Sequence, residues 1–135
     1  MSKHSINCAK STIESIIEMV ERLNAARTYD YPEELEDQYD EDSISEEIYN
    51  YPLEVTVRTG WVSPGSEDPD WYEYQILITT GGPAVRIIGD LNTYNEPDNV
   101  ILQHQDWFES WTVYPLSGYE RKKLIEFARH FYFGG

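Results

Sequence analysis

Residues 71–88 read WYEYQILITTGGPAVRII, and this stretch decides the fold. Its first half alternates apolar and polar side chains with a period of two, which is typical of a half-buried β-strand. The triplet Gly81-Gly82-Pro83 interrupts the alternation, and residues 84–88 resume it. Because the connection is short and glycine-rich, we predict an antiparallel hairpin with a tight turn. A phosphate-binding loop is the weaker interpretation, since its glycine and lysine spacing is missing.

Two further runs extend the predicted sheet on either side of this hairpin. Residues 53–58 alternate apolar and polar side chains, and residues 100–104 form another short run after the hairpin. The connections are too short for helical crossovers, so we expect antiparallel neighbours. The aromatic stretch 107–114 would either extend the sheet or cover it as a lid.

Helical patterns flank the sheet at both ends of the chain. Between about residues 5 and 26, apolar residues recur every three or four positions and form one stripe. Ser117 and Glu120 form a capping-box pattern that starts a second helix, expected over about 117–133. We therefore predict one α+β domain over residues 1–135. An antiparallel sheet of about four strands in the region 53–114 is flanked by N- and C-terminal helices.

The composition restricts the possible partners. The chain holds 25 acidic and ten basic residues, a formal net charge of −15, whereas solubility of a small domain needs a magnitude of only about 2–8. This excess argues against nucleic acid and anionic membranes as direct partners and favours a basic protein. No apolar run approaches the roughly 18 residues that cross a bilayer, and no signal-peptide core follows the N-terminus. We expect a cytoplasmic protein.

Ten carboxylates gather between Tyr29 and Asn50, and no Lys or Arg occurs between Arg27 and Arg58. One interpretation is a solvated loop, which charge runs commonly form. The other is a folded strip that imitates the phosphate backbone of duplex DNA, because Tyr, Leu and Ile residues at near-helical intervals would dock it on the domain. The second interpretation assigns partner contacts to Glu33, Glu34, Glu36, Asp37, Asp40, Glu41, Asp42, Glu46 and Glu47.

Aromatic residues are also dense towards the end of the predicted sheet. Part of this set must belong to the core, but Trp and Tyr are also the residues that anchor protein interfaces. We expect Trp107 and Trp111 to add apolar anchors to the partner-binding surface.

The remaining polar residues give little support to catalysis or metal binding. Cys8 is the only cysteine, and a small buried thiol is commoner than a nucleophile served by His104 or His130. His104 and Asp106 form a possible general-base pair, but without a nucleophile a structural histidine is the better interpretation. The run Asp37–Asp42 lacks the glycine of a calcium loop. We predict no catalytic residue, no metal site and no cofactor.

The motif pair TTGGPAVRI at residues 79–87 and QHQDWF at residues 103–108 resembles small acidic proteins of phages and mobile elements. The likeness covers roughly residues 53–133 and implies no enzymatic activity. Small acidic phage proteins include anti-CRISPR and anti-restriction inhibitors, many of which occupy DNA-binding surfaces. The resemblance therefore implies an inhibitor of a nucleic-acid-targeting defence system of the host cell. The acidic segment lies outside the similar region, so its role rests on charge.

These observations favour a non-catalytic DNA mimic that binds a basic protein or complex of such a defence system. Two alternatives stay open. One is a small enzyme or ligand-binding domain that uses the sheet face around Arg86, His104 and Asp106. The other is a structural phage or mobile-element protein without an inhibitory role.

Overall fold

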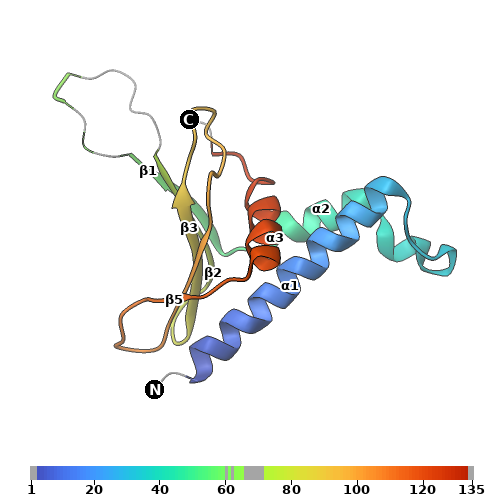
Figure 1. Cartoon of the computed structure of the whole chain (residues 1–135), viewed down its shortest axis with the longest axis horizontal. Helices are drawn as coiled ribbons and strands as arrows, with labels where there is room; N and C mark the ends of the chain where they lie inside the picture. The colour runs from blue at the N-terminus through green and yellow to red at the C-terminus, as the bar shows by residue number, and fades with distance from the viewer. Residues whose placement is uncertain (1–2, 60, 62, 66–71, 134–135) are drawn as a thin grey trace.

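A five-stranded antiparallel sheet and a layer of helices on one of its faces make up the described part of the chain (Figure 1). The structure is a computed structural model that describes residues 3–59, 61, 63–65 and 72–133. The predicted α+β class is confirmed, with one strand more than expected. In chain order the elements are α1 (Lys3–Thr28), the 3₁₀ helix η1 (Glu33–Tyr39), α2 (Glu41–Asn50), β1 (Glu54–Arg58), β2 (Glu73–Thr79), β3 (Ala84–Asp90), β4 (Ile101–Gln105), β5 (Thr112–Tyr114) and α3 (Gly118–Ala128).

The sheet is a meander in which each strand pairs with its neighbour in the sequence. Ile76 of β2, Ile87 of β3 and Leu102 of β4 lie opposite one another and are fully buried. The same row continues to Tyr114 of β5, so part of the aromatic stretch extends the sheet. β2 begins at Glu73, and the residue predicted to start it, Trp71, lies outside the described residues.

The glycine-rich turn between β2 and β3 forms as predicted. Gly81 has a φ of 90°, in the left-handed region that glycine adopts without a steric penalty. The indole ring of Trp107, from the β4–β5 connection, packs against the neighbouring Gly82. The turn therefore closes the hairpin and contacts the β4–β5 connection.

The two terminal helices begin or end at slightly different residues than predicted. α1 extends by two residues at each end, and Tyr29, with a φ of 55°, terminates it. Ser117 and Glu120 form the predicted capping box of α3. α3 ends at Ala128 instead of about residue 133, because the chain turns back to bury Phe133 against the ring of Tyr74. No helix in the described ranges is both long and apolar enough to span a membrane.

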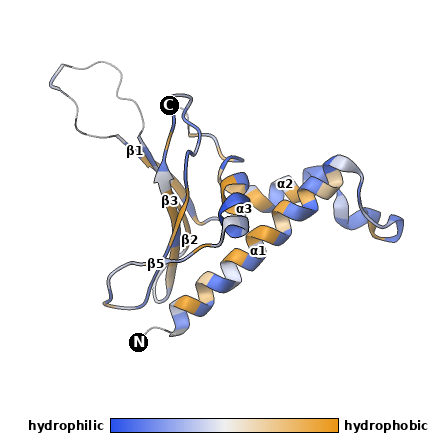
Figure 2. Cartoon of the chain, viewed as in Figure 1, coloured by the Kyte–Doolittle hydropathy of each residue, from blue (hydrophilic) through white to orange (hydrophobic). Residues whose placement is uncertain are grey.

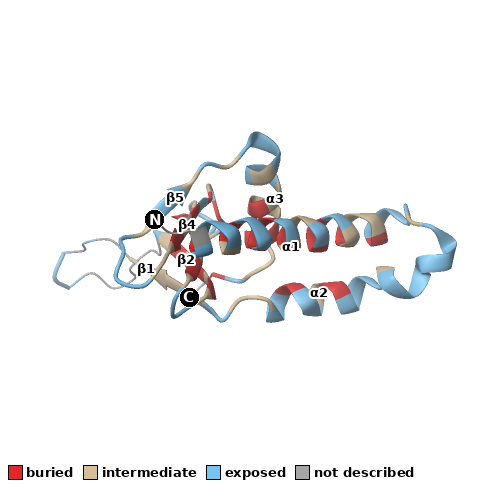
Figure 3. Cartoon of the chain, turned by 90° about the horizontal axis from the view of Figure 1, so that it is seen from below, coloured by how far each residue is buried: buried red, intermediate tan, exposed pale blue. Residues whose placement is uncertain are grey.

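One hydrophobic cluster joins the three α-helices to the sheet. α1 contributes a continuous buried stripe, visible along the side of the helix that faces the other elements (Figure 3). Ile44 and Ile48 of α2, and Leu124 and Phe127 of α3, enter the same cluster. The α1 stripe consists of Ala9, Ile13, Ile16, Met19, Val20, Leu23 and Ala26.

Candidate functional site

The acidic segment, residues 29–50, folds into η1, which lies beyond the C-terminal end of α1, and α2, which runs back alongside α1 (Figures 1 and 3). Most of its residues are hydrophilic (Figure 2). η1 contains no buried residue, whereas α2 turns Ile44 and Ile48 into the core. The rings of Tyr31 and Tyr39 stack with their centroids 4.9 Å apart and so close the loop that carries η1. The segment is thus anchored at both ends while η1 stands out from the domain.

Four carboxylates of η1 form two rows. In a 3₁₀ helix, side chains three residues apart lie on the same side, so Glu33 aligns with Glu36 and Glu34 aligns with Asp37. At a rise of about 2 Å per residue, these four charges occupy about 8 Å of helix axis. The resulting spacing of roughly 2–3 Å per charge is close to the 1.7 Å or so of duplex DNA.

The other carboxylates that we predicted to contact a partner have more varied surroundings. The side chain of Asp40 caps α2 by accepting a hydrogen bond from the backbone N–H of Ser43 at 3.3 Å. Glu41 pairs with Arg27 at 3.0 Å, which offsets part of its charge. Glu47 likewise pairs with an arginine of α1, while Asp42 and Glu46 are exposed and take part in no ion pair among the described residues.

The two predicted tryptophan anchors lie away from the acidic segment. Trp107 packs on the β2–β3 turn, and Trp111 lies over Arg86 on the sheet. Their loop adjoins the start of α1, where Ser5 meets Asp106, whereas Arg27 meets the acidic segment near the other end. At 1.5 Å per residue these contacts are about 33 Å apart along α1. The tryptophans therefore do not share a surface with the carboxylates of the acidic segment.

His104 lies in the buried, hydrogen-bonded position that a structural histidine would occupy. It is buried, and its Nδ1 lies 2.8 Å from the hydroxyl oxygen of Ser5 in the first turn of α1. The backbone N–H of Ser5 donates to Asp106 at 3.4 Å, so both strand-end residues hold the helix start. Cys8 is partly buried on the same helix, with its sulfur 3.9 Å from the hydroxyl oxygen of Thr79.

The structure separates the residues of the proposed alternative site. Val85 pairs with His104 on the side of the sheet that the helices cover, and Arg86 pairs with Gln103 on the opposite side. Arg86 and His104 consequently cannot line one pocket. The alternation in the sequence already indicated this separation. His104 is two residues from the apolar Leu102 and so shares its face of the sheet, whereas Arg86 is next to the buried Ile87 and so lies on the other face.

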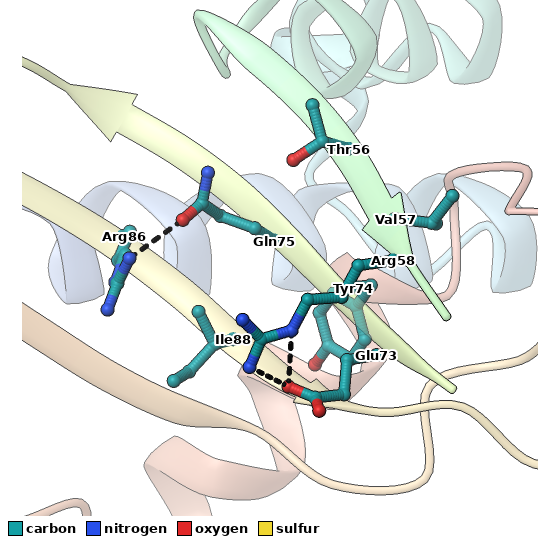
Figure 4. A pocket seen from close by; sticks show the side chains of 8 residues that line it. All are labelled: Thr56, Val57, Arg58, Glu73, Tyr74, Gln75, Arg86 and Ile88. Atoms are coloured by element: carbon teal, nitrogen blue, oxygen red, sulfur yellow. Dashed lines mark hydrogen bonds and ion pairs between the residues drawn. The ribbon is translucent and has the colours of Figure 1, made fainter. Parts of the chain in front are cut away.

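The face of the sheet opposite the helices, which we call the open face, gathers polar residues that the sequence analysis did not single out. Around Arg86 of β3 they are Thr56 and Arg58 of β1, Glu73 and Gln75 of β2, and Gln103 of β4. Figure 4 shows those of β1 and β2 together with Arg86. The sequence shows that these residues alternate with apolar ones along their strands. Their grouping around Arg86 depends on the register between strands, which the sequence does not show. Among the described residues, no three His, Cys, Asp or Glu side chains gather closely enough to hold a metal ion.

Comparison of the chain with protein-family models, with curated proteins and with solved structures finds no match.

Proposed function

We propose that the protein acts without catalysis, as an acidic inhibitor that occupies the nucleic-acid-binding surface of a basic protein. The observation that carries this proposal is the double row of exposed carboxylates on η1, Glu33 with Glu36 and Glu34 with Asp37. Within the described residues, none of the four takes part in an ion pair. A channel that binds a phosphate backbone would meet a similar charge spacing on this surface.

A groove beside these rows would add a short-range contact. It has a volume of about 520 Å³ and brings the rings of Tyr29, Tyr31 and Tyr39 together with the carboxylates of Glu36 and Glu41. Aromatic rings and carboxylates together suit an arginine or lysine side chain, which gains from stacking and from charge-assisted hydrogen bonds. The proposed partner would therefore insert a basic side chain here.

The kind of partner follows from the resemblance of the motif pair to small acidic phage and mobile-element proteins. This likeness supports a nucleic-acid-targeting defence system, such as a CRISPR effector complex or a restriction enzyme, as the basic target. Such systems act in the cytoplasm, which is where the inhibitor would work. The long-range field of the acidic segment would mainly raise the association rate, and the groove would slow dissociation.

The proposal is tested by phage challenge of bacteria that carry an active CRISPR or restriction system. Cells that express the parent protein should regain plaques of the targeted phage. The quadruple variant Glu33→Gln, Glu34→Gln, Glu36→Gln, Asp37→Asn should lose most of this effect. The purified protein should also prevent the inhibited effector from shifting its DNA in a gel, without binding the DNA itself.

A matched control removes the same number of negative charges as the η1 variant but leaves the acidic segment unchanged. The exposed residues Glu54, Glu96, Asp98 and Glu109 give such a variant when each is changed to its amide. This control should inhibit like the parent. Equal loss in both quadruple variants would mean that total charge matters and would contradict the proposed surface, as would full activity of the η1 variant.

A further inference from the structure

Arg86 occupies the centre of the open face. It belongs to β3, the middle strand, and alternates there with the buried Val85 and Ile87, so its side chain points away from the helices. None of the described helices covers this side of the sheet (Figure 1). A guanidinium at this position needs polar partners, because its own strand offers apolar neighbours.

Three side chains fix the guanidinium in place. Its Nε donates to Oε1 of Gln103 at 2.8 Å, and its Nη1 donates to Oε1 of Gln75 at 2.9 Å. The indole of Trp111 covers one face, with its ring centroid 4.1 Å from the guanidinium carbon. All three partners are neutral, and no carboxylate lies within ion-pair distance among the described residues. Arg86 is thus oriented without being neutralised, and its Nη2 edge has no partner in that set.

A cavity of about 220 Å³ adjoins this arginine on the open face (Figure 4). Arg58 lies at its far end, where it holds Glu73 through hydrogen bonds of 3.0 Å and 2.6 Å. Ile88 gives the cavity an apolar wall. Thr56 adds a hydroxyl. The oxygen of Gln75 faces Arg86, and its amide N–H₂ donates no hydrogen bond to another described residue.

The cavity is rich in donors and carries an excess of positive charge. Two guanidinium groups line it, and Glu73, the one carboxylate among its described lining residues, already accepts from Arg58. Burial, and secondly the charge of Arg58, lower the pKa of Arg86 from its usual value. An anion placed between the two arginines would offset both effects, and the apolar wall would accept a small carbon skeleton.

We propose that this cavity binds a small organic anion, a single carboxylate or phosphate group on a compact carbon skeleton. Arg86 and the Gln75 amide would hold the anionic oxygens, and Ile88 would contact the carbon atoms. Drug-sized ligands fill about 300–1,000 Å³, so this cavity selects a smaller molecule. The site lies on the sheet and does not involve the acidic segment.

Nuclear magnetic resonance titration of the full chain tests the site, with benzoate, phenyl phosphate and the neutral benzamide as probes. The anions should shift the Arg86 Nε–H signal and the side-chain amide signals of Gln75 and Gln103 in a saturable manner. The tighter of the two anions identifies the preferred group. Benzamide should shift them far less, because it lacks the charge that the guanidinium recognises.

Two variants and a matched control make the result specific. Arg86→Gln should abolish the saturable shifts. Arg86→Lys, which keeps the charge without the planar fork, should weaken binding by at least about tenfold, as expected for a lost charge-assisted hydrogen bond. Arg121→Gln, on the exposed side of α3, should bind like the parent. If Arg86→Gln fails to fold, the response of the Arg86 Nε–H signal in the parent protein decides whether the anions bind at this site.

The inference is overturned if neither anion moves the Arg86 signal, if benzamide binds as well as the anions, or if folded Arg86→Gln binds like the parent. The phage assay separates this site from the proposed function. Arg86→Gln should restore plaques as the parent does, whereas the η1 variant should bind both anions normally.

Discussion

Nη2 of Arg22 lies 2.8 Å from both carboxylate oxygens of Glu47. This ion pair joins α1 to α2, so one carboxylate of the acidic segment is paired within the protein itself. An exposed pair of this kind contributes about 0.2–1 kcal/mol to stability. Its second consequence is electrostatic, because the nearby arginine offsets the charge of Glu47. The carboxylates of the segment therefore differ in how strongly they act on a partner.

This difference predicts a ranking of single variants. Glu47→Gln should lower the free energy of unfolding by at most about 1 kcal/mol and slow partner association only slightly. Glu36→Gln should leave stability unchanged but slow association more, because no arginine offsets Glu36 among the described residues. Urea denaturation checks the predicted effects on stability, and association kinetics with the partner check the predicted effects on binding. The reverse ranking for association would remove η1 from the interface.

The buried contact between Ser5 and His104 predicts a purely structural role for the histidine. Ser5→Ala removes the hydroxyl that meets His104 Nδ1 and should cost about 1–3 kcal/mol of stability. Ser11→Ala, exposed on the same helix, should change stability by less than about 0.5 kcal/mol. Both folded variants should inhibit normally in the phage assay. A folded Ser5→Ala protein without inhibitory activity would contradict the structural role.

The close approach of Asn99, which precedes β4, and of Tyr74 of β2 predicts a strong effect at Gly89 of β3. A Cβ atom there would overlap the backbone oxygen of Asn99 and would lie 2.8 Å from the ring of Tyr74. Because the backbone at Asn99 and the buried ring of Tyr74 cannot both move away, Gly89→Ala should lower the free energy of unfolding by about 1–3 kcal/mol or more. Gly118→Ala meets no atom within 4 Å at the start of α3 and should be neutral or slightly stabilising. Thermal melting of the two variants provides the comparison.

His130 predicts a loss of stability in mild acid. Burial, and secondly the charge of Arg27, lower its pKa in the folded protein below the usual value of about 6.5. Between these two pKa values the unfolded chain binds a proton that the folded protein does not. The contribution of neutral His130 is therefore present above about pH 6.5 and is lost as the pH falls towards the lower, folded pKa. The parent should lose more stability than His130→Gln over this range, and identical pH profiles would refute the assignment.

The strands and terminal helices could be predicted because each has a clear period. Ile76, Ile78 and the turn at Gly81 define the central hairpin without further information. For β5 the sequence left two alternatives, a further strand or a lid, because Thr112–Tyr114 is too short to show an alternation and lies among aromatic residues. The early end of α3 was missed, because Phe133 continues an apolar pattern but packs on Tyr74 instead.

The candidate surfaces were predictable only in part. The run of carboxylates marked the acidic segment, but the pairing of Glu41 and Glu47 with arginines of α1 depends on where α2 packs. Trp111 was grouped with these carboxylates because both residue types occur at interfaces. Its position over Arg86 follows from the register of β3, β4 and β5. The register between strands cannot be deduced from the alternation along a single strand.

The most direct measurement of the central claim is the association rate constant with the defence complex that the protein inhibits, by surface plasmon resonance over a salt series. The quadruple variant Glu33→Lys, Glu34→Lys, Glu36→Lys, Asp37→Lys is measured alongside, with a melting curve for each protein. We predict that the parent associates more slowly as salt rises while its dissociation changes little, because screening acts over about 8 Å at physiological ionic strength. The lysine variant should associate at least about tenfold more slowly at an unchanged melting temperature. A lysine variant that binds as fast and as tightly as the parent would contradict the account.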